Sequence, residues 1–147
     1  MNKIKDILRH KPADVWTIGP DDTVYRALEV LAEKNVGALP VMDAGRLIGI
    51  FSERDYARKC ILKGRHSEET PVKDLMSSPV VTIDPDFSID DCLAMMTDRQ
   101  FRHLPVVTGG RLIGMVSIGD IGKWIISEQR SEIRDLEGYI RGDRAPH

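Results

Sequence analysis

The chain contains the same stretch of about 40 residues twice. Residues 15–55 align with residues 80–120 at a constant offset of 65 positions and without a gap, and 16 of the 41 aligned positions are identical. The longest shared run is Gly-Arg-Leu-Ile-Gly, at residues 45–49 and again at 110–114. A repeat of this length and similarity predicts two copies of one fold unit.

A short prelude to each copy also recurs. Residues 4–8 resemble residues 72–76 at an offset of 68, so the first copy carries three extra residues around Lys11, Pro12 and Ala13. These boundaries predict three parts in the chain. They are a first domain over 4–66, a second domain over 72–127, and a C-terminal helical extension and tail over 128–147.

Both copies show the same order of secondary-structure signals. In the first copy, residues 16–18 form a short extended run, and two apolar strands over 38–42 and 47–51 flank a tight turn. A helix lies between the extended run and the first strand, and a second helix runs from Ser52 to a stop at Gly64. The apolar stripe of the first helix is Val24, Ala27, Leu28, Leu31 and Ala32. The side chains expected to face inward from the second helix are Tyr56, Ala57, Cys60 and Ile61.

One such unit has an apolar sheet face and helix stripe that it cannot cover alone. Two units packed against each other would cover both. The predicted fold is therefore of the mixed α/β (α+β) class, with two β-α-β-β-α units packed sheet to sheet in pseudo-twofold symmetry and an extended C-terminal helix. Symmetric clefts between the units would be natural ligand sites.

Composition and missing motifs argue against several functions. The formal net charge is -2 with no basic block, which disfavours a nucleic-acid partner. No apolar run approaches the ~20 residues of a membrane span. Cys60 and Cys92 form no CxxC motif and no zinc spacing and fall on apolar helix faces, so both are expected to be buried thiols in a reducing cytoplasm. We find no nucleophile with a nearby base, no phosphate loop and no metal spacing, so no catalytic or metal residues are assigned and no enzyme is expected.

The start of the second helix in each copy has groups suited to a phosphorylated ligand. In the first copy, free backbone N–H groups at the helix start would attract an anion, Ser52 can donate to a phosphate oxygen, and Arg54 adds a fork of donors. Asp55 can accept hydrogen bonds from the paired hydroxyls of a ribose. The same Ser-x-x-Asp spacing is also an ordinary helix cap. Capping and ligand contact are compatible with each other.

The second copy keeps Ser117 and Asp120 but has Gly119 where the first has Arg54. Its positive charge could come from Arg102 and His103, just before the strand that begins with Leu104. The alternative for His103 is packing at a strand edge, since an imidazole with a pKa near neutrality suits either role. The two clefts are therefore expected to differ in affinity or in preferred nucleotide.

The ordered set of motifs resembles the CBS domain, whose tandem pair is called a Bateman module. The resemblance rests on the element order, the Leu-Pro-Val strand, the Gly-Arg-Leu-Ile-Gly turn and strand, and the Ser-x-x-Asp helix start, all present twice between residues 4 and 124. It implies a regulatory module that binds AMP, ADP, ATP or NAD in the clefts. The Ser resembles the family's phosphate contact and the Asp its ribose ligand. The adenine edge would be read by Thr17, Ile18, Thr82 and Ile83. The apolar floor would be formed by Ala38, Leu39, His103 and Leu104.

The last helix is expected to run from Ser117 to about Tyr139, beyond the CBS unit. It would fold back or pack against another chain, and we favour a homodimer because CBS pairs commonly assemble in twos. A separate effector protein is expected to receive the signal. The alternative function is a nucleotide-independent interaction or dimerisation module that regulates a partner.

Overall fold

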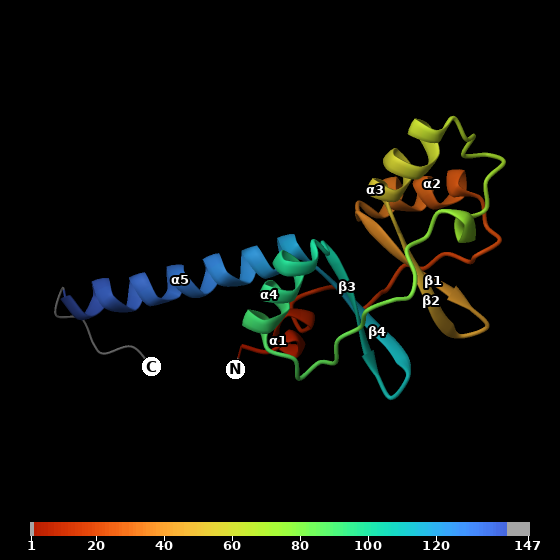
Figure 1. Ribbon diagram of the computed structural model, residues 1–147. Helices are drawn as coiled ribbons and strands as arrows, with labels where there is room; N and C mark the ends of the chain where they lie inside the picture. The colour runs from red at the N-terminus through yellow and green to blue at the C-terminus, as the bar shows by residue number, and fades with distance from the viewer. Residues whose placement is uncertain (1, 141–147) are drawn as a thin grey trace.

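The computed structural model describes residues 2–140, which form two similar units joined by a linker and followed by a long helix (Figure 1). The first unit contains α2 (Val24–Lys34), β1 (Ala38–Asp43), β2 (Arg46–Ser52), α3 (Glu53–Asp55), η1 (Tyr56–Cys60) and η2 (Ile61–Lys63). The second contains α4 (Ile89–Arg99), β3 (His103–Thr108), β4 (Arg111–Ser117) and α5 (Ile118–Ile140). Two preludes precede them: α1 (Ile4–Leu8) and the 3-10 turn η3 (Val72–Asp74). The predicted pair of mixed units with a C-terminal helix is confirmed, and residues 141–147 of the predicted tail lie outside the described residues.

Each unit is built on an antiparallel hairpin. β1 pairs with β2 and β3 with β4, and the register is the same in both, with a bulge at Val41/Met42 and at Val106/Val107. The turn residues Ala44 and Gly45 have φ of 50° and 80°, the left-handed values that a two-residue hairpin turn requires. The extended run expected at 16–18 contributes only a parallel bridge from Ile18 to Val41.

The first helix of each unit is capped at both ends. Thr23 accepts a hydrogen bond from Arg26 N at the start of α2, and Ser88 accepts one from Asp91 N at the start of α4. Asn35 and Gln100 end these helices in the left-handed conformation. The predicted stripe of α2 faces the core except for Ala32, which is exposed.

The helix predicted from Ser52 to Gly64 is irregular. Three α-helical residues are followed by the π-helical turn η1 and the 3-10 turn η2, and the segment ends at Gly64 with φ 71°. The wider π turn rotates the inward face away from the one that regular spacing predicts. Cys60 is buried and Tyr56 partly buried, whereas Ala57 and Ile61, which were expected inward, are exposed.

The two preludes cross over, so that each packs on the unit of the other copy. Ile4 and Ile7 of α1 lie in the core of the second unit, and Val72 and Leu75 lie in the core of the first. The same backbone hydrogen bonds fix both crossings. Ile4 N donates to Phe87 O and Val72 N to Asp22 O; Ile89 N donates to Asn2 O and Val24 N to Thr70 O. The pseudo-twofold symmetry therefore extends to these hydrogen bonds.

Helix α5 leaves the second unit and projects beyond the rest of the chain (Figure 1). Its first turns pack on β4, α4 and α1, where Ile121 is buried and Trp124 half-buried. Further along, four large apolar side chains are exposed: Ile126, Ile133, Leu136 and Tyr139. In the part of α5 that the structure describes, this apolar face is therefore not folded back on the module.

Candidate functional site

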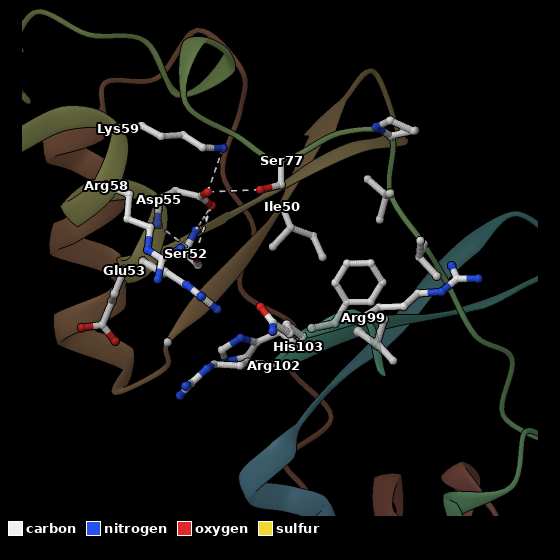
Figure 2. A pocket seen from close by; sticks show the side chains of 18 residues that line it. Ile50, Ser52, Glu53, Asp55, Arg58, Lys59, Ser77, Arg99, Arg102 and His103 are labelled. Carbon is white, nitrogen blue, oxygen red and sulfur yellow. Dashed lines mark hydrogen bonds and ion pairs between the residues drawn. The ribbon is translucent and has the colours of Figure 1, made fainter. Parts of the chain in front are cut away.

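A cavity of about 730 Å³ lies where the two units meet, and we call it the first cleft (Figure 2). Its walls come from three segments of the chain. The first unit supplies the end of β2 with α3 and η1, the linker supplies Ser77 and residues 79–81, and the second unit supplies residues 99–104. A ligand in this cleft would touch both units at once.

Asp55 lies in the wall of the first cleft and is only 7% exposed. Its Oδ2 atom accepts hydrogen bonds from Ser52 N (2.9 Å) and Ser52 Oγ (3.0 Å). Its Oδ1 atom accepts from Ser77 Oγ at 3.1 Å and pairs with Lys59 Nζ at 3.0 Å. Ser52 Oγ accepts in turn from Asp55 N, so the helix cap that the Ser-x-x-Asp spacing indicates is present as a capping box. The carboxylate is thus fixed in place beside the cavity.

The backbone N–H groups expected to be free at this helix start are largely engaged. Glu53 N donates to Gly37 O at 3.1 Å, and Asp55 N donates to Ser52 Oγ at 3.2 Å. With these two N–H groups engaged, side chains supply most of the positive charge that faces the first cleft.

Cationic side chains outnumber carboxylates along the cleft. The cations are Arg54, Arg58, Lys59, Arg99 and Arg102, and the carboxylates are Glu53 and Asp55. Arg54, Arg58 and Arg102 are exposed, and guanidinium groups bind phosphate oxygens in a fork geometry. Apolar side chains cover the remaining wall, including Ile50, Val81 and Phe101. An apolar wall beside an excess of cations suits a flat aromatic group that carries phosphates.

His103 lies between the sites of the two copies. It faces Ser117 across the β3–β4 hairpin and lines the first cleft, and its Nε2 atom lies 3.1 Å from where a Cβ on Gly37 would be. Burial lowers its pKa below the ordinary value; the Asp120 carboxylate opposes this shift, and Lys11 and Arg102 add to it. The sequence assigned Arg102 and His103 to the site of Ser117 and Asp120. The structure instead lines the first cleft with both, alongside Arg54, because the start of β3 faces the other unit.

Ser117 and Asp120 form the matching cap in the second unit, and we call their surroundings the second site. Asp120 Oδ2 accepts from Ser117 N at 2.8 Å, and Asp120 N donates to Ser117 Oγ at 3.1 Å. The same oxygen pairs with Lys11 Nζ at 2.7 Å. Burial acts to raise the pKa of Asp120, but the hydrogen bonds from Lys11 and Ser117 outweigh it and hold the pKa below its usual value.

The strand residues expected to read an adenine lie elsewhere. Ile18 and Ile83 are buried, and their backbone groups are already used: Ile18 N donates to Pro40 O and Ile18 O accepts from Met42 N, with the same pattern at Ile83. Thr17 and Thr82 are exposed outside the walls of the first cleft. Ala38 and Leu39 are buried in the first unit, and of the expected apolar floor only His103 and Leu104 line the first cleft.

Sequence reasoning missed several residues of the two sites. Ser77 and residues 79–81 follow the second prelude, Arg99 ends α4 and Phe101 lies just after it, and Lys11 is one of the three extra residues of the first copy. The crossed preludes bring Ser77 and Lys11 to these sites. In the sequence, the prelude repeats at an offset of 68 and the rest of the copy at 65. This difference was the one sequence signal that the contacts of the prelude differ between the copies.

The described residues give no support to two other kinds of function. Across residues 2–140, no group of three or more His, Cys, Asp or Glu side chains is arranged to hold a metal ion. Over the same residues, every helix is too short or too polar to cross a membrane.

Comparison with known proteins gives a consistent result. The family model of the CBS domain matches residues 4–61 and 72–127. The mitochondrial CBS domain-containing protein CBSX3 of Arabidopsis thaliana is 42% identical over 95% of this chain and 72% of its own. A putative signal-transduction protein with CBS domains from Burkholderia ambifaria superposes with a TM-score of 0.84 at 44% identity, over 86% of this chain and 96% of that one. A hexameric CBS-CP12 protein from bloom-forming cyanobacteria gives a TM-score of 0.73 at 26% identity, over 81% and 69%.

Proposed function

This chain belongs to the CBS domain family, of which it holds a tandem pair, and from that premise we propose that its first cleft binds an adenine nucleotide as a regulatory ligand. Tandem CBS domains are regulatory modules that bind adenosine-containing ligands, and stand-alone pairs are not catalysts. For this chain the proposed ligands are AMP, ADP, ATP or NAD.

The observation that carries the proposal is the composition of the first cleft. A nucleotide needs an apolar surface for its base, an acceptor for its ribose hydroxyls and cations for its phosphates. Val81 and Phe101 offer an apolar surface for the base, and Asp55 offers an acceptor for the ribose hydroxyls. The exposed arginines offer cations for the phosphates. To receive a ribose, Asp55 would exchange its contact with Lys59 or Ser77 for the ribose hydroxyls, while Ser52 N continues to hold its Oδ2 atom.

We infer that the ligand signals by changing how the two units sit relative to each other. A ligand shifts an equilibrium only by binding one arrangement better than another. Since the walls of the first cleft come from both units and the linker, a bound nucleotide would favour the arrangement that closes around it. The change would be read by a separate effector protein. The chain itself would not be an enzyme, and with two buried free thiols, Cys60 and Cys92, it would suit a reducing cytoplasm.

We also propose a homodimer formed through α5. The exposed face of Ile126, Ile133, Leu136 and Tyr139 recurs at helical spacing, as expected for a helix that packs on another chain. A related CBS-CP12 protein is hexameric, so assembly through copies of the chain has a precedent among similar folds. If the first cleft bound no nucleotide, this surface would leave a dimerisation or interaction module as the second candidate function.

A thermal-shift panel with AMP, ADP, ATP, NAD and S-adenosylmethionine tests nucleotide binding. A ligand at 100 times its dissociation constant stabilises the folded state by about 2.7 kcal/mol. Arg54→Ala and Arg102→Ala remove exposed cations of the cleft and should weaken the shift. Arg46→Ala removes another exposed arginine, at the opposite end of β2 from the cleft, and should leave the shift unchanged. No shift with any of the five compounds would refute nucleotide binding by the native chain.

A further inference from the structure

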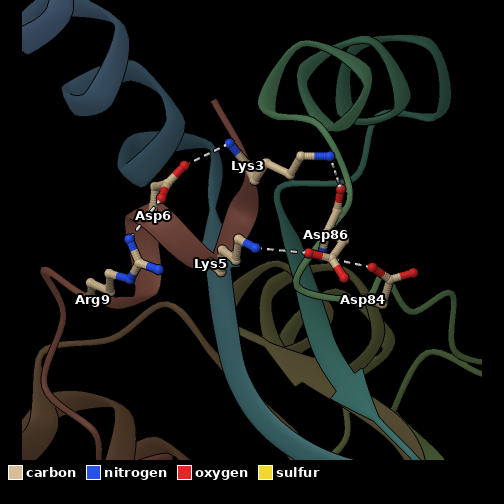
Figure 3. A network of polar contacts seen from close by, with 6 residues as sticks. All are labelled: Lys3, Lys5, Asp6, Arg9, Asp84 and Asp86. Carbon is tan, nitrogen blue, oxygen red and sulfur yellow. Dashed lines mark hydrogen bonds and ion pairs between the residues drawn. The ribbon is translucent and has the colours of Figure 1, made fainter. Parts of the chain in front are cut away.

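The first turns of α5 are fixed on the second unit. They pack on α1, α4 and β4, and the ring of His10 stacks on Trp124 with 5.9 Å between the ring centroids. α1 is itself held on this unit, because Lys5 Nζ lies 3.1 Å from Asp86 Oδ1 and Lys3 Nζ donates to Asp86 O (Figure 3). The rest of α5 therefore leaves the module in a direction that this packing sets, and a partner need not order its base.

Beyond these turns, the exposed apolar side chains of α5 follow a seven-residue repeat. Ile126 and Ile133 are seven positions apart and Leu136 follows three positions later, which is the a, a and d spacing of a coiled coil. Gln129 occupies the other d position, and we call these four residues the seam. Its three apolar side chains are at least half exposed, so the part of the chain that the structure describes does not cover the seam. A second helix with the same repeat would cover it.

Charged side chains flank the seam. In the same repeat, Arg130 and Glu137 fall at e positions on one side, and Glu132 falls at a g position on the other. All three are exposed, and within residues 2–140 none of them has an ion-pair partner. Charges at e and g positions set the orientation of paired helices, because they face charges of the partner beside the buried seam. The signs of these three charges therefore discriminate between the possible pairings.

Two pairings of α5 with a second copy would bring like charges together. In a parallel pair, each g residue faces the next e residue of the partner, which sets Glu132 against the partner's Glu137. In an antiparallel pair, e faces e and g faces g. If such a pair is centred between Gln129 and Ile133, Arg130 faces the partner's Arg130 and Glu132 faces the partner's Glu132. Both pairings are therefore disfavoured by like-charge repulsion.

An antiparallel pair shifted by one heptad brings opposite charges together instead. Its centre lies between Ile133 and Leu136, so each of these side chains packs on the other type in the partner. Arg130 then faces the partner's Glu137 at two symmetric places. Glu132 lies beside the partner's Tyr139, whose hydroxyl can donate to the carboxylate. Of the three pairings, only this one joins opposite charges.

We propose that α5 pairs with α5 of a second copy in this antiparallel register, and that the contact of Arg130 with the partner's Glu137 sets the register. Because each helix leaves its own module from a fixed base, the two modules then lie at opposite ends of the helix pair. The inference rests on the proposed homodimer. It adds the orientation of the two copies and the residues by which they recognise each other.

Sedimentation equilibrium of full-length charge variants tests this register. Arg130→Glu and Glu137→Arg should each raise the dimer dissociation constant about tenfold, because both Arg–Glu contacts become like-charge contacts. The double variant Arg130→Glu/Glu137→Arg restores both contacts and should return to within about twofold of the native value. Asp135→Arg is the matched control, because it reverses the same charge at an exposed position away from the seam. It should change the dissociation constant by less than about twofold.

Disulfide cross-linking reports the orientation directly. Chains that carry Ile133→Cys should cross-link with chains that carry Leu136→Cys, because the two positions face each other. Ile126→Cys should not cross-link with itself, because its two copies lie about 25 Å apart along the antiparallel pair. In a parallel pair these two copies would face each other and cross-link. The native Cys60 and Cys92 are buried and do not compete.

The outcomes separate the orientation from the proposed homodimer. If the native chain is a dimer but Glu137→Arg tightens it, or Ile126→Cys cross-links with itself, the helices are parallel and the antiparallel register is overturned while the dimer stands. A dimer that none of the charge variants weakens also overturns the register. A native chain that sediments as a monomer refutes both proposals. Circular dichroism of each variant excludes loss of helix as the cause of a weaker dimer.

Discussion

Met76 Sδ lies 2.5 Å from the position that a Cβ on Gly49 would occupy. Met76 Cγ and the backbone oxygen of Ser77 lie 3.0 and 3.2 Å from the same point. The pseudo-symmetric pair is Gly114 with Leu8, at 2.8 Å from its Cδ2 atom. In both units, the glycine that ends the shared Gly-Arg-Leu-Ile-Gly run leaves room for the prelude of the other copy.

Gly49→Ala should therefore destabilise the protein by about 1–3 kcal/mol, the usual cost of forcing extra volume into a packed site. The thioether can move, but the Ser77 carbonyl is held by its hydrogen bond from Ile50 N at 3.0 Å. Urea denaturation gives the measurement. Gly122→Ala is the control: a Cβ there meets nothing within 4 Å, and alanine in a helix interior should be neutral or stabilising by up to about 1 kcal/mol. Equal stability of Gly49→Ala and the native chain would contradict the close approach.

Ile4→Ala should destabilise the second unit, although Ile4 precedes the first copy in the sequence. Ile4 is 0% exposed in the second core, and removing such a side chain costs about 2–5 kcal/mol. Hydrogen exchange should show the loss of protection in α4 and β3 before α2 and β1. Ile61→Ala, at a 56% exposed position, should stay within about 0.5 kcal/mol of the native chain. Loss of protection confined to the first unit would refute the crossing of the preludes.

His103 should make stability fall as the pH drops below about 6.5. Burial lowers its pKa in the folded chain, with Lys11 and Arg102 acting in the same direction and Asp120 against it. In the unfolded chain the His pKa is about 6.5, so the unfolded chain binds the proton more tightly than the folded chain does. The stabilisation that is present above pH of about 6.5 is therefore lost as the pH falls from the unfolded pKa through the folded pKa. Urea midpoints at pH 7.5 and 5.5 should differ less in His103→Gln than in the native chain. His66→Gln, at an exposed position, should keep the native difference.

Ile133→Glu/Leu136→Glu should convert a dimer to a monomer. Both side chains are more than half exposed on α5, and two carboxylates on a face buried between chains would cost more than the contact gains. Sedimentation velocity at micromolar concentration measures the assembly state. Arg134→Glu changes the charge on the opposite side of the same helix, away from this apolar face, and should leave the dimer intact. A native chain that sediments as a monomer would remove the dimer proposal.

The internal repeat was enough to predict the architecture, because gapless identity at 16 positions leaves little room for two different folds. Strands and helix caps followed from local signals such as Ser88 and the Ala44-Gly45 turn. The π-helical turn after Asp55 could not be foreseen, since it depends on how Cys60 and Tyr56 pack in the core. Regular helical spacing therefore assigned the wrong face to Ala57 and Ile61.

The candidate site was predictable only where a residue lies in the repeat. Ser52, Arg54 and Asp55, to which the helix-start pattern pointed, line the first cleft. The expected adenine contacts at Ile18 and Ile83 overlooked the backbone hydrogen bonds that these residues make to their own hairpins. The contributions of Ser77 and Lys11 depend on the crossed preludes, and no property of a single copy indicates that crossing.

The crossing of the preludes also determines which unit carries the two ends of the described chain. α1 lies in the second core and α5 continues directly from β4, so the described residues nearest both ends belong to the same unit (Figure 1). The first unit is thus an insertion within the second: the chain enters it after α1 and returns through the linker. A force or a tether applied at either end would therefore act directly on the second unit. It would reach the first unit only through the two chain segments that connect the units.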